Sequence, residues 1–421
     1  MSEILLELTA DRQRALAEMV VAWVARHDRL EPENVAPPTV VQAEVVLAGR
    51  PGLVDVIAEV GGRTAHVVVG LRRPGEEAHT LRTGDDPVLG LLEDDSGLAV
   101  GLDALADADL APLVLGAVTG TREGPGAVSV GPEDPEMVVL TFGDRWSLTV
   151  FPWLAEGPEP SVAFLVALDE AGFNHVAAPL ALWRRGGRDL GLVQEQLAGG
   201  AGGWALAQAS LRDLFATEGP AEAAGGDFAP EARALGTMTA RMHLACDRAF
   251  GRQPEPVAEW AAGVRTVVGA GDPSLLDVER VGETLATLER SELRCATVRS
   301  HGDFHLGRTA RTDHGWVVAD CRPGGVPPGA DGPVPRSPLA DVADLLWSLH
   351  LAATEAAAER DPAERGGVGG PALDWEARNR RAFLAGYLAT PGIGGLVPAD
   401  RAVLGDLLAA FELERAARAE R

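Results

Sequence analysis

Two aspartates that flank a short apolar stretch constrain this chain more than any other feature of its sequence. Asp303 lies within residues 300–308 (SHGDFHLGR), where glycine and histidine predict a tight loop after a strand. Asp320 ends the apolar run 316–320 (WVVAD), which predicts a short strand that returns to the same place. Two carboxylates directed at one place suit phosphoryl transfer, in which one accepts the proton of the attacking hydroxyl and the other holds Mg²⁺.

These segments resemble the catalytic core of the aminoglycoside-phosphotransferase branch of the kinase fold, and within it the bacterial maltokinases and glucosamine kinases. Those families carry His-Gly-Asp-x-His-x-Gly-Gln, then Asp-Phe-Glu, and then a helix that begins Ser-Pro-Leu-x-Asp-Val-Ala. Residues 337–343 (SPLADVA) match the last motif, and Ser337 suits an N-cap with Pro338 in the first helical turn. The resemblance implies an α+β, two-lobed protein-kinase-like fold with an N-terminal maltokinase-type cap.

The resemblance implies three parts: a cap-like domain at 1–122, a kinase small lobe with its hinge at 123–198, and a mostly helical large lobe at 199–421. Apolar periodicity predicts the elements that such a fold requires. Strands are predicted at 40–46, 53–60, 64–71, 137–142, 146–151, 181–184 and 191–197, helices at 5–27, 161–171, 204–216, 230–245, 256–268, 276–291, 338–359, 375–388 and 398–421, and a glycine-rich loop at 366–370.

Roles for individual residues follow from the same resemblance. Asp303 is expected to be the catalytic base and Asp320 the carboxylate that holds the metal. The strand that ends at Leu197 is expected to supply the hinge, so that Glu195, Gln196 and Leu197 would bind the nucleotide through their backbone groups.

The loop around the predicted base is expected to be braced by its neighbours. In similar proteins His301 and His305 support the loop backbone, and Asp341 tethers the loop from the following helix. An alternative interpretation of His-x-Asp-x-His is a metal site formed by His301, Asp303 and His305.

Four positions depart from the family pattern. Thr149 and Ala163 stand where active relatives keep a lysine and its glutamate partner. Both members of that ion pair have therefore been replaced together. Arg308 replaces the metal-binding amide, and Arg322 replaces the second acid. All 37 basic residues are arginine, so no other lysine can take the place of the missing one. An arginine such as Arg145 is the alternative that could do so.

Arg308 decides how the site is interpreted. A guanidinium is always protonated and offers no lone pair, so it cannot be a metal ligand. We therefore predict an ion pair between Arg308 and Asp320 in the volume that a metal would fill. In an active enzyme, Arg308 would instead grip the phosphates of a nucleotide.

Composition excludes several classes of partner. The formal net charge of −25 disfavours binding to nucleic acid or to an anionic membrane surface. No apolar run reaches the length of a membrane span, and no signal-peptide pattern is present at the N-terminus. The three cysteines show no paired spacing, which indicates a reducing compartment. We expect a cytoplasmic protein.

Three functions remain open from the sequence. The leading hypothesis is a pseudokinase that needs no cofactor and acts as a binding or regulatory partner of another protein in sugar metabolism, since loss of the phosphate- and metal-binding groups costs several orders of magnitude in rate. The alternative is an active Mg²⁺- and ATP-dependent kinase of maltose, an amino sugar or another small hydroxyl compound. The third is a metal-free nucleotide or sugar-phosphate binder that uses Arg308 and Arg322.

Overall fold

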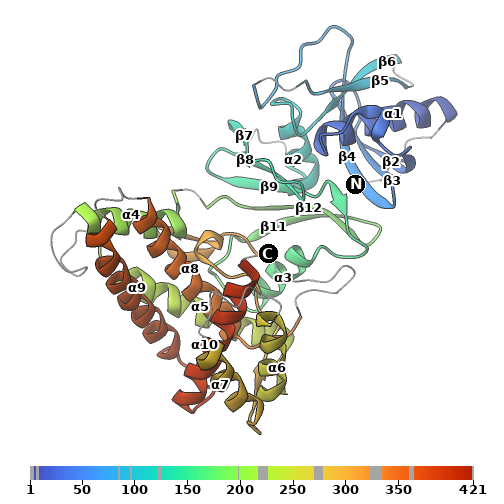
Figure 1. Cartoon of the computed structure of the whole chain (residues 1–421). Coiled ribbons are helices and arrows are strands. Elements are labelled where there is room, and N and C mark those ends of the chain that lie inside the picture. Colours follow the sequence, from blue (N-terminus) through green and yellow to red (C-terminus); the bar gives the residue numbers. More distant parts are fainter. Residues whose placement is uncertain are drawn as a thin grey trace. The chain divides into compact units, whose positions relative to one another are not determined.

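The computed structural model describes residues 4–5, 9–83, 86–94, 97–121, 126–197, 199–216, 226–269, 278–322, 334–359 and 365–419. Contacts divide the chain, shown in Figure 1, into two compact units, each of which is taken by itself below. The first consists of Met1–Val162 and Ala178–Ala198, and the second of Ala163–Ala177 and Gly199–Arg421. The predicted cap and most of the predicted small lobe fall within the first unit, whereas residues 163–177 of that lobe belong to the second. The separation of cap and small lobe stays a proposal.

In the described part of the first unit, seven strands form an antiparallel sheet in the order β1-β2-β3-β4-β6-β5, with β10 paired to β4. Their bounds are Ile4–Leu5 (β1), Thr39–Leu47 (β2), Gly52–Val60 (β3), Arg63–Arg72 (β4), Val88–Asp94 (β5), Gly97–Asp103 (β6) and Trp153–Leu154 (β10). Helix α1 (Ala10–His27) packs on this sheet through the predicted stripe of Leu16, Met19, Val20, Trp23 and Val24, all of which are buried. The three strand predictions and the helix are confirmed here, except that the helix begins at Ala10 and Leu5 belongs to β1. Residues 6–8 of the predicted helix lie outside the described residues.

A second sheet in the first unit has the order β11-β12-β9-β8-β7. Its strands are Val128–Val130 (β7), Val138–Phe142 (β8), Trp146–Val150 (β9), Pro179–Arg185 (β11) and Arg188–Glu195 (β12), and helix α2 (Ala111–Thr119) contacts β11 and β12. A short 3₁₀ turn, Pro32–Asn34, follows α1.

Buried ion pairs join the two sheets of the first unit. Asp55 of β3 lies 2.7 Å from His66 Nε2 of β4, and neither side chain is exposed to solvent. Arg185 of β11 pairs with Asp55 and lies 2.8 Å from Glu44 Oε2 of β2. Since each buried charge has an opposite partner, its desolvation is compensated only while the sheets stay together.

The second unit is mostly helical. Its helices are the C-terminal part of α3 (Pro160–Glu170), then α4 (Gly203–Ala216), α5 (Ala229–Phe250), α6 (Val257–Val268), α7 (Val278–Glu289), α8 (Leu339–Ala358), α9 (Arg365–Leu388) and α10 (Arg401–Ala419). Short strands β13 (Ala201–Gly202), β16 (Thr309–Thr312) and β17 (Gly315–Val318) pair with one another, as do β14 (Gln253–Pro256) and β15 (Arg294–Thr297). The 3₁₀ turns are Leu306–Arg308 and Ile393–Gly395.

Glycine permits the close packing of α5 against α9. A Cβ atom on Gly236 of α5 would lie 2.1 Å from the backbone oxygen of Phe383, and one on Gly386 of α9 would lie 2.0 Å from that of Arg233. Both contacts are with backbone, which cannot rotate away as a side chain would. The two helices therefore meet at glycine on both sides.

Two sequence predictions need correction in the second unit. Residues 366–370, predicted as a glycine-rich loop, belong to α9 despite the low helix propensity of glycine. Helix α8 begins at Leu339 with Pro338 as its N-cap residue, one position later than predicted, while Ser337 Oγ still accepts the Leu339 N–H at 3.3 Å. Among the described residues, no helix has both the length and the apolar character needed to cross a membrane.

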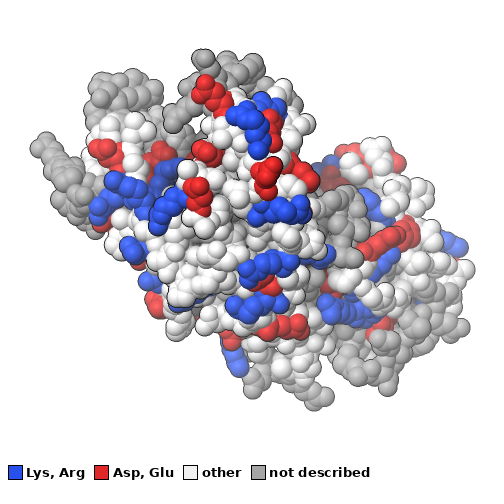
Figure 2. Space-filling model, turned by 90° about the horizontal axis from the view of Figure 1, so that it is seen from below, with Lys and Arg blue, Asp and Glu red and all other residues white. Residues whose placement is uncertain are grey.

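On the face of the molecule shown in Figure 2, arginines and acidic residues are interspersed. Neither sign forms a continuous area on that face. The acidic residues that give the chain its negative net charge therefore form no separate patch on the face that is shown.

Candidate functional site

The loop that carries Asp303 is held in the second unit by buried side chains that follow the aspartate. Phe304 and Leu306 are completely buried, and Gly302 takes a positive φ of 78° that other residues rarely adopt. The tight loop predicted after a strand therefore follows β15 and leads into the 3₁₀ turn at Leu306–Arg308.

Asp341 binds this loop from the first turn of α8. Its carboxylate accepts hydrogen bonds from the backbone N–H groups of His301 (2.9 Å) and Gly302 (2.7 Å) and lies 3.1 Å from His243 Nε2. Burial acts to raise the pKa of Asp341, but its hydrogen bond with His243, the charges of His243 and His301 and the hydrogen bond from Gly302 hold that pKa below its ordinary value. Asp341 has the contacts that a tether of the loop needs.

The two histidines beside Asp303 contact the backbone of the loop and its surroundings. His301 is buried, and its Nε2 lies 2.8 Å from the carbonyl oxygen of Asp320, while burial lowers its pKa. His305 Nδ1 accepts the N–H of Gly307 at 3.2 Å, and its Nε2 is 3.7 Å from Asp303 Oδ2. Among the described residues, no three His, Cys, Asp or Glu side chains are grouped to hold a metal, so the alternative His-Asp-His site is not formed.

The predicted ion pair between Arg308 and Asp320 is present. Arg308 Nη1 pairs with Asp320 Oδ2, and Arg308 Nη2 donates to Asp303 Oδ2 at 3.1 Å, so one guanidinium joins both carboxylates. Arg322 adds a second guanidinium to Asp320, with its Nε 2.9 Å and its Nη2 2.7 Å from Oδ2. Burial acts to raise the pKa of Asp320, but these arginines keep it below its ordinary value.

A third arginine, Arg415 of α10, was missed by the sequence analysis. Its Nη1 lies 3.3 Å from Asp303 Oδ1, and its Nε lies 3.8 Å from Asp344 Oδ1 of α8. A signal existed, because Arg415 follows the buried Phe411 by one helical turn and so lies on the core-facing side of α10. An arginine on such a face requires an acidic partner.

The carboxyl groups and guanidiniums together define the chemistry of this site. Burial acts to raise the pKa of Asp303, but His305, Arg308 and Arg415 hold it well below its ordinary value. The carboxylates of Asp303 and Asp320 have oxygen atoms that could bind a metal ion. At the third position, where the resemblance implies a metal-binding amide, Arg308 has a guanidinium without a lone pair. This set does not fit a magnesium ion held in the family's manner.

Asp344 behaves differently from its neighbours. Burial, and next the charge of Asp341, raise its pKa to about 7 although Arg415 and Arg336 oppose the change. An unfolded aspartate has a pKa of roughly 3.9, so between about pH 4 and pH 7 the folded chain binds a proton that the unfolded chain does not. This proton makes stability fall as the pH rises through that window.

Replacement of Asp344 by asparagine is therefore expected to remove this pH dependence. Urea unfolding measures the free energy of unfolding of both proteins at several pH values. The value for Asp344→Asn minus that for the wild type should increase from about pH 4 to about pH 7. A difference between the two proteins that stays constant over this range would contradict the assignment.

The predicted hinge residues lie in the first unit, at the end of β12. The backbone N–H of Glu195 donates to Ala178 O at 3.1 Å, and that of Gln196 donates to Arg145 O at 2.9 Å, while Leu197 follows the strand. Their binding to a nucleotide stays a prediction. Thr149 lies in the neighbouring strand β9, opposite Leu192 of β12, and brings no charge to that position.

No protein-family model matches the chain. A glucosamine kinase from Streptacidiphilus jiangxiensis is 31% identical over 266 residues, which cover 58% of this chain, and the chain spans 57% of the length of that relative. A solved structure of a glucosamine kinase in complex with glucosamine, ADP and inorganic phosphate has a TM-score of 0.66 at 19% identity, over 98% of this chain and 94% of that one. A second glucosamine kinase structure, crystal form B, has a TM-score of 0.63 at 21% identity, over 98% and 94%.

The likeness to the solved structures establishes the fold, and the curated relative supports the resemblance found in the motifs around Asp303 and Asp341. Both agree with the α+β architecture described above. The chain therefore has the kinase-like fold of the glucosamine kinase structures, and over 58% of its length its sequence is similar to that of a glucosamine kinase.

Proposed function

We propose that this chain is a sugar-kinase-like protein with little or no phosphotransferase activity, which acts as a binding or regulatory partner of another protein in sugar metabolism. The observation that carries the proposal is the guanidinium of Arg308, which pairs with Asp303 and Asp320 at once. In phosphoryl transfer, these two carboxylates have separate tasks at a base and at a metal. A side chain bound to both competes with both tasks.

Charge supports the same conclusion. The guanidiniums of Arg308, Arg322 and Arg415 surround the two carboxylates of Asp303 and Asp320, so the cluster already carries more positive than negative charge. A divalent cation would enter against that charge and would have to displace a charge-assisted hydrogen bond, which contributes roughly 1.5–3 kcal/mol.

The state of the predicted base points the same way. A general base works best when its pKa lies near the operating pH. The pKa of Asp303 is held far below that range by its cationic neighbours. Its carboxylate is thus stabilised in the ionised form and accepts a proton reluctantly.

One observation favours an active kinase as a second candidate. The loop of Asp303 keeps its tether, since Asp341 still accepts the backbone N–H groups of His301 and Gly302. If the enzyme is active, its substrates are ATP and a small hydroxyl compound, and its cofactor is Mg²⁺. The related structure that contains glucosamine and ADP makes a sugar and a nucleotide the first ligands to test.

A turnover assay separates the two candidates. Purified chain with ATP, Mg²⁺ and glucosamine, glucose or maltose is expected to give no product above the level of an Asp303→Asn variant, because the base and the metal carboxylate are both engaged by arginine. Turnover of any sugar that Asp303→Asn abolishes would overturn the proposal in favour of an active kinase.

A further inference from the structure

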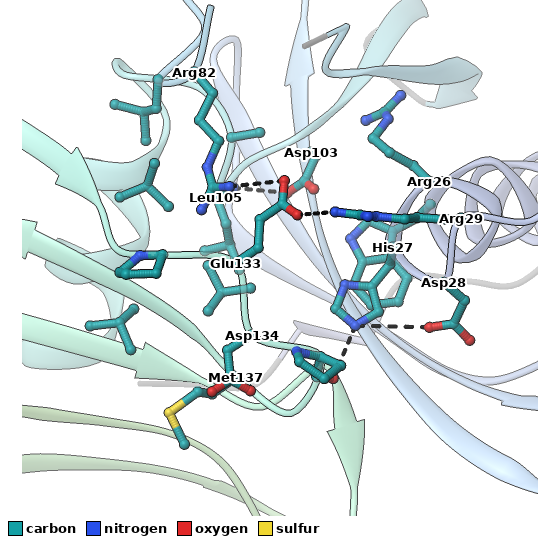
Figure 3. A pocket seen from close by; sticks show the side chains of 18 of the residues that line it. Arg26, His27, Asp28, Arg29, Arg82, Asp103, Leu105, Glu133, Asp134 and Met137 are labelled. Carbon is teal, nitrogen blue, oxygen red and sulfur yellow. Dashed lines mark hydrogen bonds and ion pairs between the residues drawn. The ribbon is translucent and has the colours of Figure 1, made fainter. Parts of the chain in front are cut away.

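A cavity of about 630 Å³ lies within the first unit, and its lining includes none of the residues assigned above to kinase chemistry. Figure 3 shows it between the C-terminal end of α1, the end of β6 and the segment that joins β7 to β8. Apolar side chains such as Leu105 and Val138 share its wall with charged ones. Cavities of this size and mixed lining hold small molecules.

Asp103, at the end of β6, is a partly buried carboxyl in the wall. Its carboxylate accepts the backbone N–H of Leu105 at 3.0 Å and a hydrogen bond from the side chain of Trp23, and burial raises its pKa. Part of its surface nevertheless remains accessible, and Asp103 lines the cavity. A carboxyl that is deep in the protein and still accessible offers its remaining lone pairs to a molecule inside.

Arg26 provides a donor near this acceptor. Its charge acts on Asp103, but its Nη2 donates to the backbone oxygen of Val88 at 3.2 Å instead of forming an ion pair with that carboxyl. A guanidinium carries five N–H donors, so one such bond leaves others to the cavity. A donor and an acceptor thus line the same space.

The positive and negative side chains in the wall of the cavity are equal in number. Among the described residues, four arginines and four acidic residues line the cavity. Arg29 and Arg82 both pair with Glu133, with Arg82 Nη1 3.1 Å from Glu133 Oε1, and Arg63 lies 3.4 Å from Asp28 Oδ2. Because the charges balance, the cavity gains no electrostatic preference for an anion or a cation.

An aromatic pair completes the wall. The rings of Trp23 and His27 stack with their centroids 4.7 Å apart, and His27 Nε2 lies 3.1 Å from the backbone oxygen of Pro135. Flat apolar surface beside paired donors and acceptors suits a molecule with C–H faces and hydroxyl rims, since each hydroxyl both donates and accepts.

We propose that this cavity binds a neutral, hydroxyl-rich molecule of the size of a mono- or disaccharide. Asp103 accepts hydrogen bonds from its hydroxyls, Arg26 donates to others, and the aromatic and apolar wall covers its C–H face. The inference is independent of the function proposed for the site at Asp303. It gives the first unit a role as a sensor of a neutral sugar.

Isothermal titration calorimetry of the full chain with glucose, maltose, glucosamine and glucose 6-phosphate tests the inference. Glucose or maltose is expected to bind about tenfold or more tightly than the two charged sugars. Asp103→Asn is expected to weaken that binding about tenfold, the effect of a hydrogen bond to a charged or strongly polar group. Val130→Trp, which places a bulky ring in the cavity wall on strand β7, is expected to abolish it.

Two controls make the result specific. Asp11→Asn removes a carboxyl on α1 that is 90% exposed, and it should leave sugar binding unchanged. Asp303→Asn should also leave it unchanged, because that residue lies in the other unit.

Loss of binding in Asp303→Asn together with its persistence in Val130→Trp would place the sugar at the kinase-type site and overturn the inference. The inference is equally wrong if neither neutral sugar binds to the wild type, or if the charged sugars bind more tightly. Circular dichroism checks that each variant remains folded, and Val130→Trp keeps the test decisive if Asp103→Asn does not fold.

Discussion

Replacement of Arg308 by glutamine together with Arg322 by glutamate is expected to give the chain an affinity for Mn²⁺ that is about 100-fold higher than that of the wild type. The reason is that both guanidiniums bound to Asp320 disappear, while an amide oxygen and a carboxylate take their positions. Hard divalent cations prefer such oxygen ligands. Electron paramagnetic resonance of Mn²⁺ measures the free and bound ion directly, without any need for enzymatic activity.

Arg311→Gln is the matched control for this double variant. Arg311 also forms an ion pair, with its Nε 2.9 Å from Glu231 Oε2, but it contacts neither Asp303 nor Asp320 in the structure. Its replacement should not change Mn²⁺ binding. Equal Mn²⁺ affinity in the wild type and the double variant would show that the arginines do not exclude the metal.

Replacement of Asp341 by alanine is expected to lower the free energy of unfolding by about 3–5 kcal/mol, the cost of leaving buried partners of a charge uncompensated. The carboxylate is completely buried, and its loss leaves the N–H groups of His301 and Gly302 and the ring of His243 without their acceptor. Urea unfolding followed by circular dichroism measures the change.

Asp313→Ala serves as the control, because Asp313 is an exposed aspartate in the turn between β16 and β17. Its replacement should change stability by less than about 0.5 kcal/mol. A similarly small effect for Asp341→Ala would mean that the loop of Asp303 holds its conformation without the tether.

Part of the fold was predictable because its buried segments are recognisable as apolar runs and stripes. The stripe of α1 is confirmed at helical spacing, and the strands at 53–60 and 64–71 are confirmed as nearly continuous buried runs. Strands β5 and β6 were not predicted, because exposed Leu91 and Leu98 and interspersed glycine obscure their alternation. The prediction of a loop at 366–370 was wrong because it followed the low helix propensity of glycine, whereas α9 continues through these residues.

The candidate site was predictable where chemistry limits the partners of one residue. Arg308 cannot bind a metal, so pairing with the adjacent Asp320 was the expected outcome, and it is observed. Arg415 was missed because its contact with Asp303 depends on where α10 packs, which no local pattern specifies. The cavity around Asp103 was hidden for the same reason, since its walls come from segments that are distant in sequence.

The central claim is that guanidinium groups stand where an active relative would hold a metal. Calorimetric titration of ATP into the wild-type chain, with and without Mg²⁺, tests it most directly. Equal affinity in both conditions, or no ATP binding in either, is the predicted result, since the ion pairs at Asp303 and Asp320 leave no place for the ion. ATP binding that requires Mg²⁺ and is lost in Asp320→Asn would contradict the account.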